Sequence, residues 1–165
     1  MNMLANFAHR FFEEDRASVL IETAFVAPAL VGLTLGGVEA GAMYARQTQL
    51  QQIASNSMEI VLTSAPTTEL EGAATLNQVR AYAAEASGLT ATTSSEPAVG
   101  QVAVYKRYRC GNNSARQATY GCSNESQSIS TFVVIYLRTS YSPVWTNYGI
   151  GQDFEFNVKR SVQIG

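Results

Sequence analysis

The hydrophobic pattern changes sharply near the start of the chain. Residues 1–22 carry six charged side chains, whereas residues 23–45, TAFVAPALVGLTLGGVEAGAMYA, carry only Glu39. As a helix, this apolar stretch would be about 34 Å long, enough to cross a hydrocarbon layer of about 30 Å. Every face of it would be apolar or small, and the roughly 120 residues that follow are too few to surround it. The pattern therefore favours a membrane-spanning helix over a buried core helix.

A cleavable secretory signal is a further alternative for the same stretch. Ala40, Gly41 and Ala42 have the small-x-small form of a signal cleavage site. However, the apolar run is longer than a usual signal core, follows a segment of mixed charge and carries Glu22 at its start. These features favour a span that the mature protein retains.

The polar sequence after the apolar stretch keeps a helical period. Apolar residues recur at helical spacing, and no Gly or Pro interrupts residues 42–65. One continuous helix is therefore predicted over about residues 16–64, and Pro66 would end it. Pro28 lies inside this helix and should kink it, because proline lacks the N–H that a helix interior needs.

The remaining sequence predicts an α+β domain in which helices precede strands. A second helix is expected over residues 69–87, between a capping box at residues 68–71 and Gly88. Residues 90–97, TATTSSEP, are typical of a loop. Alternating or apolar runs predict strands over residues 99–109, 130–141 and 154–164. This order favours a small antiparallel sheet packed on the long helix, rather than a parallel sheet.

The strand patterns also predict the core of this domain. Along the last strand the apolar residues share one face, and Arg160 is the one charge on that face. The middle strand is the most apolar run, so either of its faces could be the buried one. The side chains expected in the core are Phe132, Val134, Phe154, Phe156 and Val158.

Composition narrows the possible chemistry. The 165 residues include 11 Lys and Arg against 13 Asp and Glu, for a net charge of -2, and they form no basic stripe for a nucleic-acid backbone. The single histidine, His9, excludes a His-based triad, a multi-His metal site and most general-base schemes. We therefore expect no catalytic residues, no cofactor, no metal and no nucleic-acid partner.

One short basic cluster nevertheless stands out. Lys106, Arg107 and Arg109 are interleaved with Tyr105 and Tyr108. Such a cluster can contact an anionic surface or a partner, although it is also typical of a solvated strand face.

Charge bias and the cysteines bear on topology. Arg10 and Arg16 precede the apolar stretch, whereas only Arg46 follows it closely, so the positive-inside rule places the N-terminus in the cytosol. Cys110 and Cys122 then lie in the exported part, in an oxidising compartment where a disulfide is favoured. A two-cysteine metal site is the alternative, but two further ligands are missing nearby.

The entrance to the apolar stretch contains its most unusual charge. Glu22 lies about one turn inside the hydrophobic run, where an unpaired carboxylate is costly. If the chain were cut between Ala17 and Ser18, the new α-amino group of Ser18 would supply a neutralising cation. A small residue followed by Glu at the fifth position of an apolar mature helix resembles the processing site of type IV pilins. The alternative for Glu22 is a carboxylate that simply reaches the membrane interface.

Within that superfamily the chain resembles the TadE/TadG-like pseudopilins of the tight-adherence pilus system. The resemblance is carried by VLIETAFVAP at residues 19–28, by GVEAG at residues 37–41, and by YARQ at residues 44–47 with LQQIA at residues 50–54. The sequence departs from the family at three positions. It has Ala17 where the family often has Gly, Thr23 where the family usually has Phe or Tyr, and Ala40 where a bulky residue is common.

The resemblance implies a minor pilin or pseudopilin of the bacterial inner membrane. Residues 1–17 would be a cytoplasmic leader that a prepilin peptidase removes, residues 18–64 a transmembrane and periplasmic helix, and residues 65–165 an exported α+β domain. Its partners would be the lipid bilayer, the peptidase, other pilin subunits and the inner-membrane assembly platform. An uncleaved single-span anchor, serving as a binding or scaffold protein of a secretion apparatus, is the alternative.

Small residues in the span suggest how helices could associate. They recur every four residues in two rows, the first formed by Gly32, Gly36 and Ala40 and the second by Gly37, Gly41 and Ala45. Such rows let helix backbones approach closely, although a run rich in Gly and Ala also produces them by chance. Glu39 would lie near the far interface, where a carboxylate is tolerated whether or not it contacts another subunit.

Overall fold

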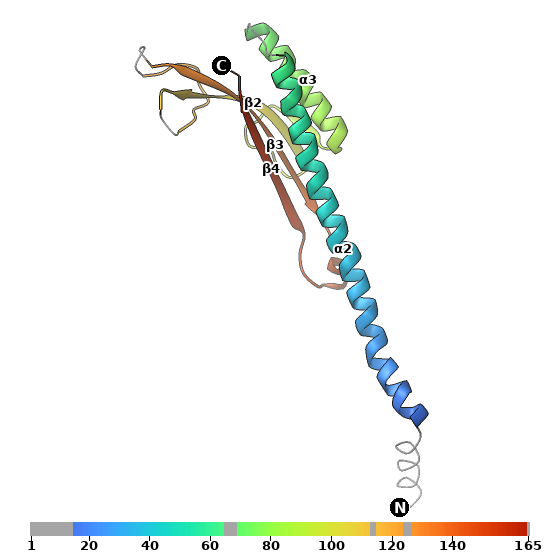
Figure 1. Cartoon of the computed structure of the whole chain (residues 1–165). Coiled ribbons are helices and arrows are strands. Elements are labelled where there is room, and N and C mark those ends of the chain that lie inside the picture. Colours follow the sequence, from blue (N-terminus) through green and yellow to red (C-terminus); the bar gives the residue numbers. More distant parts are fainter. Residues whose placement is uncertain (1–14, 65–68, 113–114, 124–126, 165) are drawn as a thin grey trace, which may run out of the picture. The chain divides into compact units, whose positions relative to one another are not determined.

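The computed structural model describes residues 15–64, 69–112, 115–123 and 127–164. Two helices precede a four-stranded sheet, so the predicted α+β class is confirmed (Figure 1). The elements are α2 (Asp15–Ser64), α3 (Glu69–Ser87), β1 (Thr90–Thr92), β2 (Gln101–Cys110), β3 (Ile129–Tyr141), a 3-10 helix (Val144–Tyr148) and β4 (Phe154–Gln163). The chain divides into two compact units, and the boundary lies between Ala42 and Met43.

The first unit contains the apolar part of α2. The helix runs without interruption through Pro28 and the glycines, and it continues to Ser64, as the sequence predicts. Proline at position 28 leaves the carbonyl of Ala24 without its helical N–H donor. A kink at this point stays a prediction.

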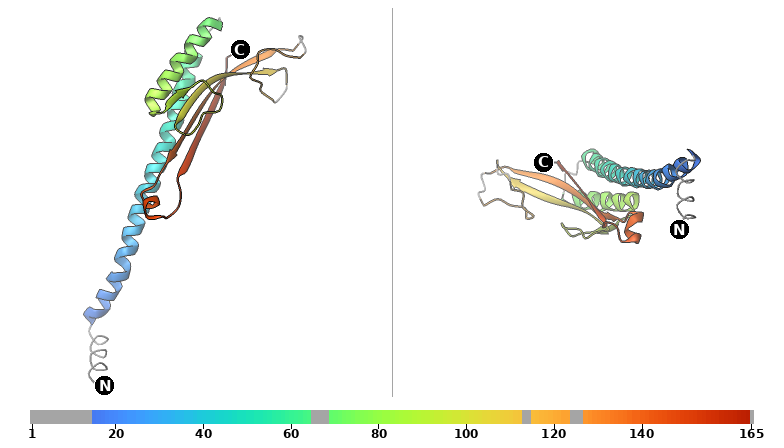
Figure 2. Two further views of the ribbon diagram at one scale, coloured as in Figure 1. Left: turned by 180° about the vertical axis from the view of Figure 1, so that it is seen from behind. Right: turned by 90° about the horizontal axis from the view of Figure 1, so that it is seen from below.

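The second unit is built around one apolar core. Residues of α2 at positions 50, 53, 54, 58 and 61 share one helical face, and they pack with α3 against the sheet. In both views of Figure 2, α3 runs beside the C-terminal part of α2. The core contains Leu50, Ile53, Ala54, Met58, Val61, Val79, Ala83, Leu89, Val102, Val104, Val133, Ile135, Leu137, Phe156 and Val158.

The second helix has the bounds that the sequence predicts. It ends at Ser87, and Gly88 takes the left-handed conformation with φ of 71°. The N–H groups of Gly88 and Leu89 both donate to the carbonyl of Ala84, which closes the helix with a glycine cap. The predicted capping box begins at Thr68, outside the described residues.

The sheet has the order β1-β2-β3-β4, with β2, β3 and β4 antiparallel and β3 central, as expected. The prediction for residues 90–97 was wrong at its start, because Thr90–Thr92 forms a fourth, edge strand that pairs in parallel with β2. The sheet is therefore mixed. Two parallel strands start at the same end, so the connection between them must run back along the whole length of the first strand. Here the first strand has only three residues, and the loop over residues 93–100 is long enough to do so.

Strand register decides which predicted core residues were right. Phe156 and Val158 lie in the core, as expected. Phe132 and Val134 are buried, but on the opposite face of the sheet from the helices, because Val133, Ile135 and Leu137 alternate with them. Phe154 is 45% exposed, so its placement in the core was wrong. It begins β4 at the end of the sheet, where few neighbours can cover it.

Candidate membrane span and exported site

The apolar part of α2 exposes its side chains. Leu20, Phe25 and Leu33 are each at least 70% exposed, and no residue of the most apolar window is buried. The described chain therefore does not bury this window, which argues against the buried core helix considered from the sequence. Among the described residues, one helix is long and apolar enough to cross a membrane. A contiguous apolar surface of this kind needs lipid or neighbouring helices to cover it.

Two threonines in the span satisfy their hydroxyl groups within the helix. Thr23 Oγ1 donates to the carbonyl of Val19 at 2.9 Å and to that of Leu20 at 3.0 Å. Thr34 Oγ1 donates to the carbonyl of Leu30 in the same way. Because each hydroxyl already has a backbone acceptor, these hydrogen bonds reduce the cost of placing the two hydroxyl groups in hydrocarbon.

The proposed processing site lies at the start of α2. The backbones of Ala17 and Ser18 are helical, and Glu22 is exposed. Residues four apart lie on one face of a helix, with about 5 to 6 Å between their Cβ atoms. The backbone of Ser18 therefore lies about one turn before Glu22, so an α-amino group at Ser18 would be within reach of the carboxylate of Glu22.

The glycine rows are not needed for packing within the chain. A Cβ added at Gly32, Gly36, Gly37 or Gly41 would meet no atom within 4 Å outside the helix's own nearby backbone. Ala40, which completes the first row, is exposed. The small side chains thus leave room that this chain does not itself fill.

Glu39 differs from its neighbours along the helix. Its side chain is 7% exposed, whereas Val38 beside it is 70% exposed. The sequence predicted a carboxylate near the far interface and left a contact with another subunit open. Because Glu39 is buried, replacing it would disturb its surroundings, so it is not a suitable control for a substitution of the exposed Glu22.

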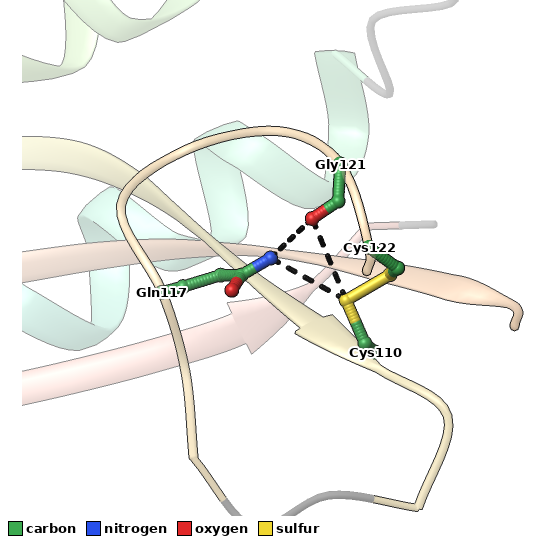
Figure 3. The surroundings of a disulfide bond; sticks show 4 residues. All are labelled: Cys110, Gln117, Gly121 and Cys122. Carbon is green, nitrogen blue, oxygen red and sulfur yellow. Dashed lines mark hydrogen bonds between the residues drawn. A yellow bond between two sulfur atoms is a disulfide. The ribbon is translucent and has the colours of Figure 1, made fainter. Parts of the chain in front are cut away.

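In the second unit, Cys110 and Cys122 form a disulfide, as predicted (Figure 3). Both sulfurs are used in this bond, so the two-cysteine metal site is excluded. Gln117 lies inside the closed loop and points its side-chain amide at the bridge, donating to Sγ of Cys110 at 3.4 Å and to the carbonyl of Gly121. No group of three or more His, Cys, Asp or Glu in the described part of the chain is arranged to hold a metal.

The disulfide loop also folds back on the sheet. The backbone N–H of Tyr108 donates to the carbonyl of Gln117 at 2.9 Å, and the reverse bond is 2.8 Å long. The carbonyl of Val104, four residues before Tyr108 in β2, accepts a hydrogen bond from Arg80 of α3 at 2.7 Å. These contacts cover part of the β2 edge that β1 is too short to reach, which protects an otherwise unpaired strand.

We expect removal of the disulfide to destabilise the exported unit. The bond joins residues 12 apart, and closing a loop of that size stabilises a fold by about 3 kcal/mol through the entropy of the unfolded chain. The Cys110→Ser/Cys122→Ser variant should therefore unfold about 10 °C lower than the parent chain in the same detergent. Reductant should lower the unfolding temperature of the parent and leave that of the variant unchanged. Equal unfolding temperatures of parent and variant would contradict the prediction.

Together, the two units define a class of protein: a small α+β domain that continues from an apolar helix able to anchor it in a membrane. The sequence of residues 17–57 matches the TadE-like protein family. Over this part of the chain, about a quarter of its length, the match agrees with the resemblance to the TadE/TadG-like pilins. No curated protein and no solved structure matches the chain.

Proposed function

We propose that the chain is a minor pilin or pseudopilin that a prepilin peptidase cuts between Ala17 and Ser18, and that helps to assemble or initiate an adhesive tight-adherence pilus. The family match over residues 17–57 carries this proposal. It covers the proposed cleavage point, Glu22 and both glycine rows, which are the features that assembly would use. The exposed apolar helix supports it further, because such a surface requires lipid or neighbouring subunits.

In this proposal, cleavage and assembly are linked by charge. Cutting after Ala17 creates an α-amino group on Ser18, on the same face of α2 as Glu22. That cation neutralises the carboxylate of Glu22, either in the same subunit or in an adjacent one, at the entrance to the hydrocarbon layer. The glycine rows then allow neighbouring helices to approach closely.

The proposed location is the bacterial inner membrane, with one span and the C-terminal domain in the periplasm before any incorporation into the fibre. The disulfide supports an exported position, because such bonds persist in oxidising compartments. The partners would be lipid, the prepilin peptidase, other pilin subunits and the inner-membrane assembly platform.

Intact-mass measurement on protein purified from its native membrane tests the cleavage. We expect a chain that lacks residues 1–17 and begins at Ser18. The Ala17→Gly variant, which restores the residue frequent in the family, should be cut at least as completely. A parent chain that keeps residues 1–17 in cells with an active prepilin peptidase would contradict the proposal.

One observation favours the alternative of an uncleaved single-span anchor with a binding or scaffold role. The helix α2 already begins at Asp15, so the bond between Ala17 and Ser18 lies in helical backbone. A peptidase generally requires an extended segment, and helix at the cut point would have to open first. A full-length chain that stays in the membrane and copurifies with the secretion apparatus would support this alternative.

A further inference from the structure

The face of the sheet that points away from the helices carries an unusual arrangement of cations and aromatic rings. Register and alternation place the side chains of Arg107, Arg109, Arg138 and Lys159 on this face, because they alternate with the positions of each strand that enter the core: Val102 and Val104 in β2, Leu137 in β3 and Val158 in β4. Arg116 joins them from the disulfide loop. Glu155 is the one acid that the described strands place there, against four cations of the same strands.

Three of these cations gather at one end of the outer face. The Cζ atoms of Arg116 and Arg109 lie 4.0 Å and 5.2 Å from the centre of the Phe132 ring. Arg107 lies directly opposite Phe132 in the strand register, and its Cζ is 5.2 Å from the ring of Tyr105. Two guanidinium groups that share one ring repel each other, and a bound anion would relieve that repulsion.

The disulfide loop fixes the position of Arg116. Gln117, the next residue, is held to the edge of β2 by its two backbone hydrogen bonds with Tyr108. The Nη1 atom of Arg116 also donates to the hydroxyl of Ser161 on β4, at 2.9 Å. The guanidinium is therefore oriented before any ligand binds, which lowers the entropy lost on binding.

These cations have few carboxylate partners. Arg138 pairs with Glu155 at 2.9 Å, and this hydrogen bond raises the pKa of Arg138 above its ordinary value. Among the described residues, no carboxylate forms an ion pair with Arg107, Arg109 or Arg116. The Nε atom of Arg109 is buried and has no hydrogen-bond partner in the same part of the chain. The positive charge at this end of the face is thus available to an external anion.

A second basic position lies further along the strands. The Nζ atom of Lys159 is 5.3 Å from the centre of the Tyr136 ring, and Lys159 is exposed. Its register position is six residues from that of Arg109, or about 20 Å along the sheet. An extended ligand with repeating anionic groups would reach both positions.

We propose that this outer face binds an acidic polysaccharide, whose carboxylates contact the arginine cluster at Phe132 and then Lys159. The face offers cations and hydroxyl or amide groups, such as those of Ser161 and Asn157, but no exposed large apolar side chain on the described strands. A protein interface of ordinary size has an apolar centre, and a lipid surface takes inserted apolar groups, so both fit less well. Single-stranded nucleic acid stacks on open rings, whereas cations cover the rings here. This inference requires neither cleavage nor fibre assembly.

Binding of polygalacturonate to the full chain in detergent tests the proposal, with fully methyl-esterified polygalacturonate as the uncharged probe. We expect binding of the acidic polymer at 50 mM salt and none of the ester. The Arg116→Gln/Lys159→Gln variant should bind at least about tenfold more weakly, since it removes two charge-assisted contacts. Both replaced side chains are exposed, and an unchanged unfolding temperature would show that the fold is intact.

The matched control is Lys106→Gln/Arg160→Gln, which removes the same charge from the helix-facing side of the same sheet. We expect it to bind polygalacturonate as the parent chain does. Equal losses in the two variants, or equal binding of the esterified polymer, would overturn the site. Tighter binding of anionic vesicles or of single-stranded DNA, lost in the first variant alone, would overturn the choice of a polysaccharide.

Discussion

Replacing Glu22 with alanine should leave the chain in the membrane and lower the yield of fibres by about tenfold or more. Insertion should persist because removing a carboxylate from the apolar stretch makes transfer into lipid more favourable. Assembly should fail because the α-amino group of Ser18 would then lack its counter-charge. An unpaired charge in a poorly solvated site typically costs several kcal/mol, and each 1.4 kcal/mol corresponds to a factor of ten.

Fibre yield, membrane fractionation and intact mass should be measured together for the Glu22→Ala variant. A full-length variant chain would place the defect in processing, whereas a cleaved chain that does not assemble would place it in subunit pairing. The matched control is Glu59→Ala, which removes an exposed carboxylate from α2 beyond the apolar stretch. Equal fibre yields from the Glu22→Ala variant and the parent would mean that Glu22 is only a carboxylate reaching the interface.

Helix bounds were predictable because local signals determine them. Gly88 ends α3 with a left-handed cap, and the apolar spacing of α2 continues to Ser64 with no breaker. The bounds of both helices agree with the sequence prediction to within one residue. The predicted strands likewise agree to within about two residues, because alternating patterns end at Gly, Ser and Pro.

Strand faces and the edge strand were harder to predict, because they depend on contacts between distant segments. The middle strand is apolar on both faces, so its pattern alone could not say whether Phe132 or Val133 faces the helices. Phe154 follows the period of its strand but lies at the end of the sheet, where alternation gives no information on burial. Thr90–Thr92 becomes a strand only because β2 lies beside it.

The membrane span and the outer face of the sheet also differ in how far the sequence alone could predict them. The span, its glycines and Glu22 are contiguous in sequence, so a linear pattern reveals them. The outer face is not contiguous: the basic cluster noticed in the sequence is divided, with Lys106 on the helix side and Arg107 and Arg109 on the other. Arg116 and Lys159 were missed, because the disulfide loop and the β3–β4 register bring them to that face. Alternation within each strand could have separated its two faces from the sequence alone. The register between the strands was still needed to show which residues of different strands lie together.

Filling the first glycine row should block helix association while leaving the single chain intact. The Gly32→Leu/Gly36→Leu variant adds side chains where the described chain has no atom within 4 Å of a new Cβ, so no internal clash at that atom arises. Leucine also favours a helix more than glycine does, by roughly 0.5 to 1 kcal/mol per site. Between two helices packed through this row, however, the added bulk forces the backbones apart. The cost of such overpacking, about 1 to 3 kcal/mol, should lower fibre yield by about tenfold.

The matched control is Ala42→Leu, which also enlarges an exposed small residue of the span. Ala42 belongs to neither four-residue row, and at about 100° per residue it lies roughly 60° or more around the helix from every member of both rows. This variant should assemble as the parent does, and crosslinks placed at Ala40, in the same row, should join neighbouring subunits in the parent and the control but not in the double leucine variant. If the double leucine variant forms fibres at the parent yield, the glycines are a by-product of composition, and helix contact must use another face. If Ala42→Leu is equally defective, the span tolerates no added volume, and the loss does not identify the row.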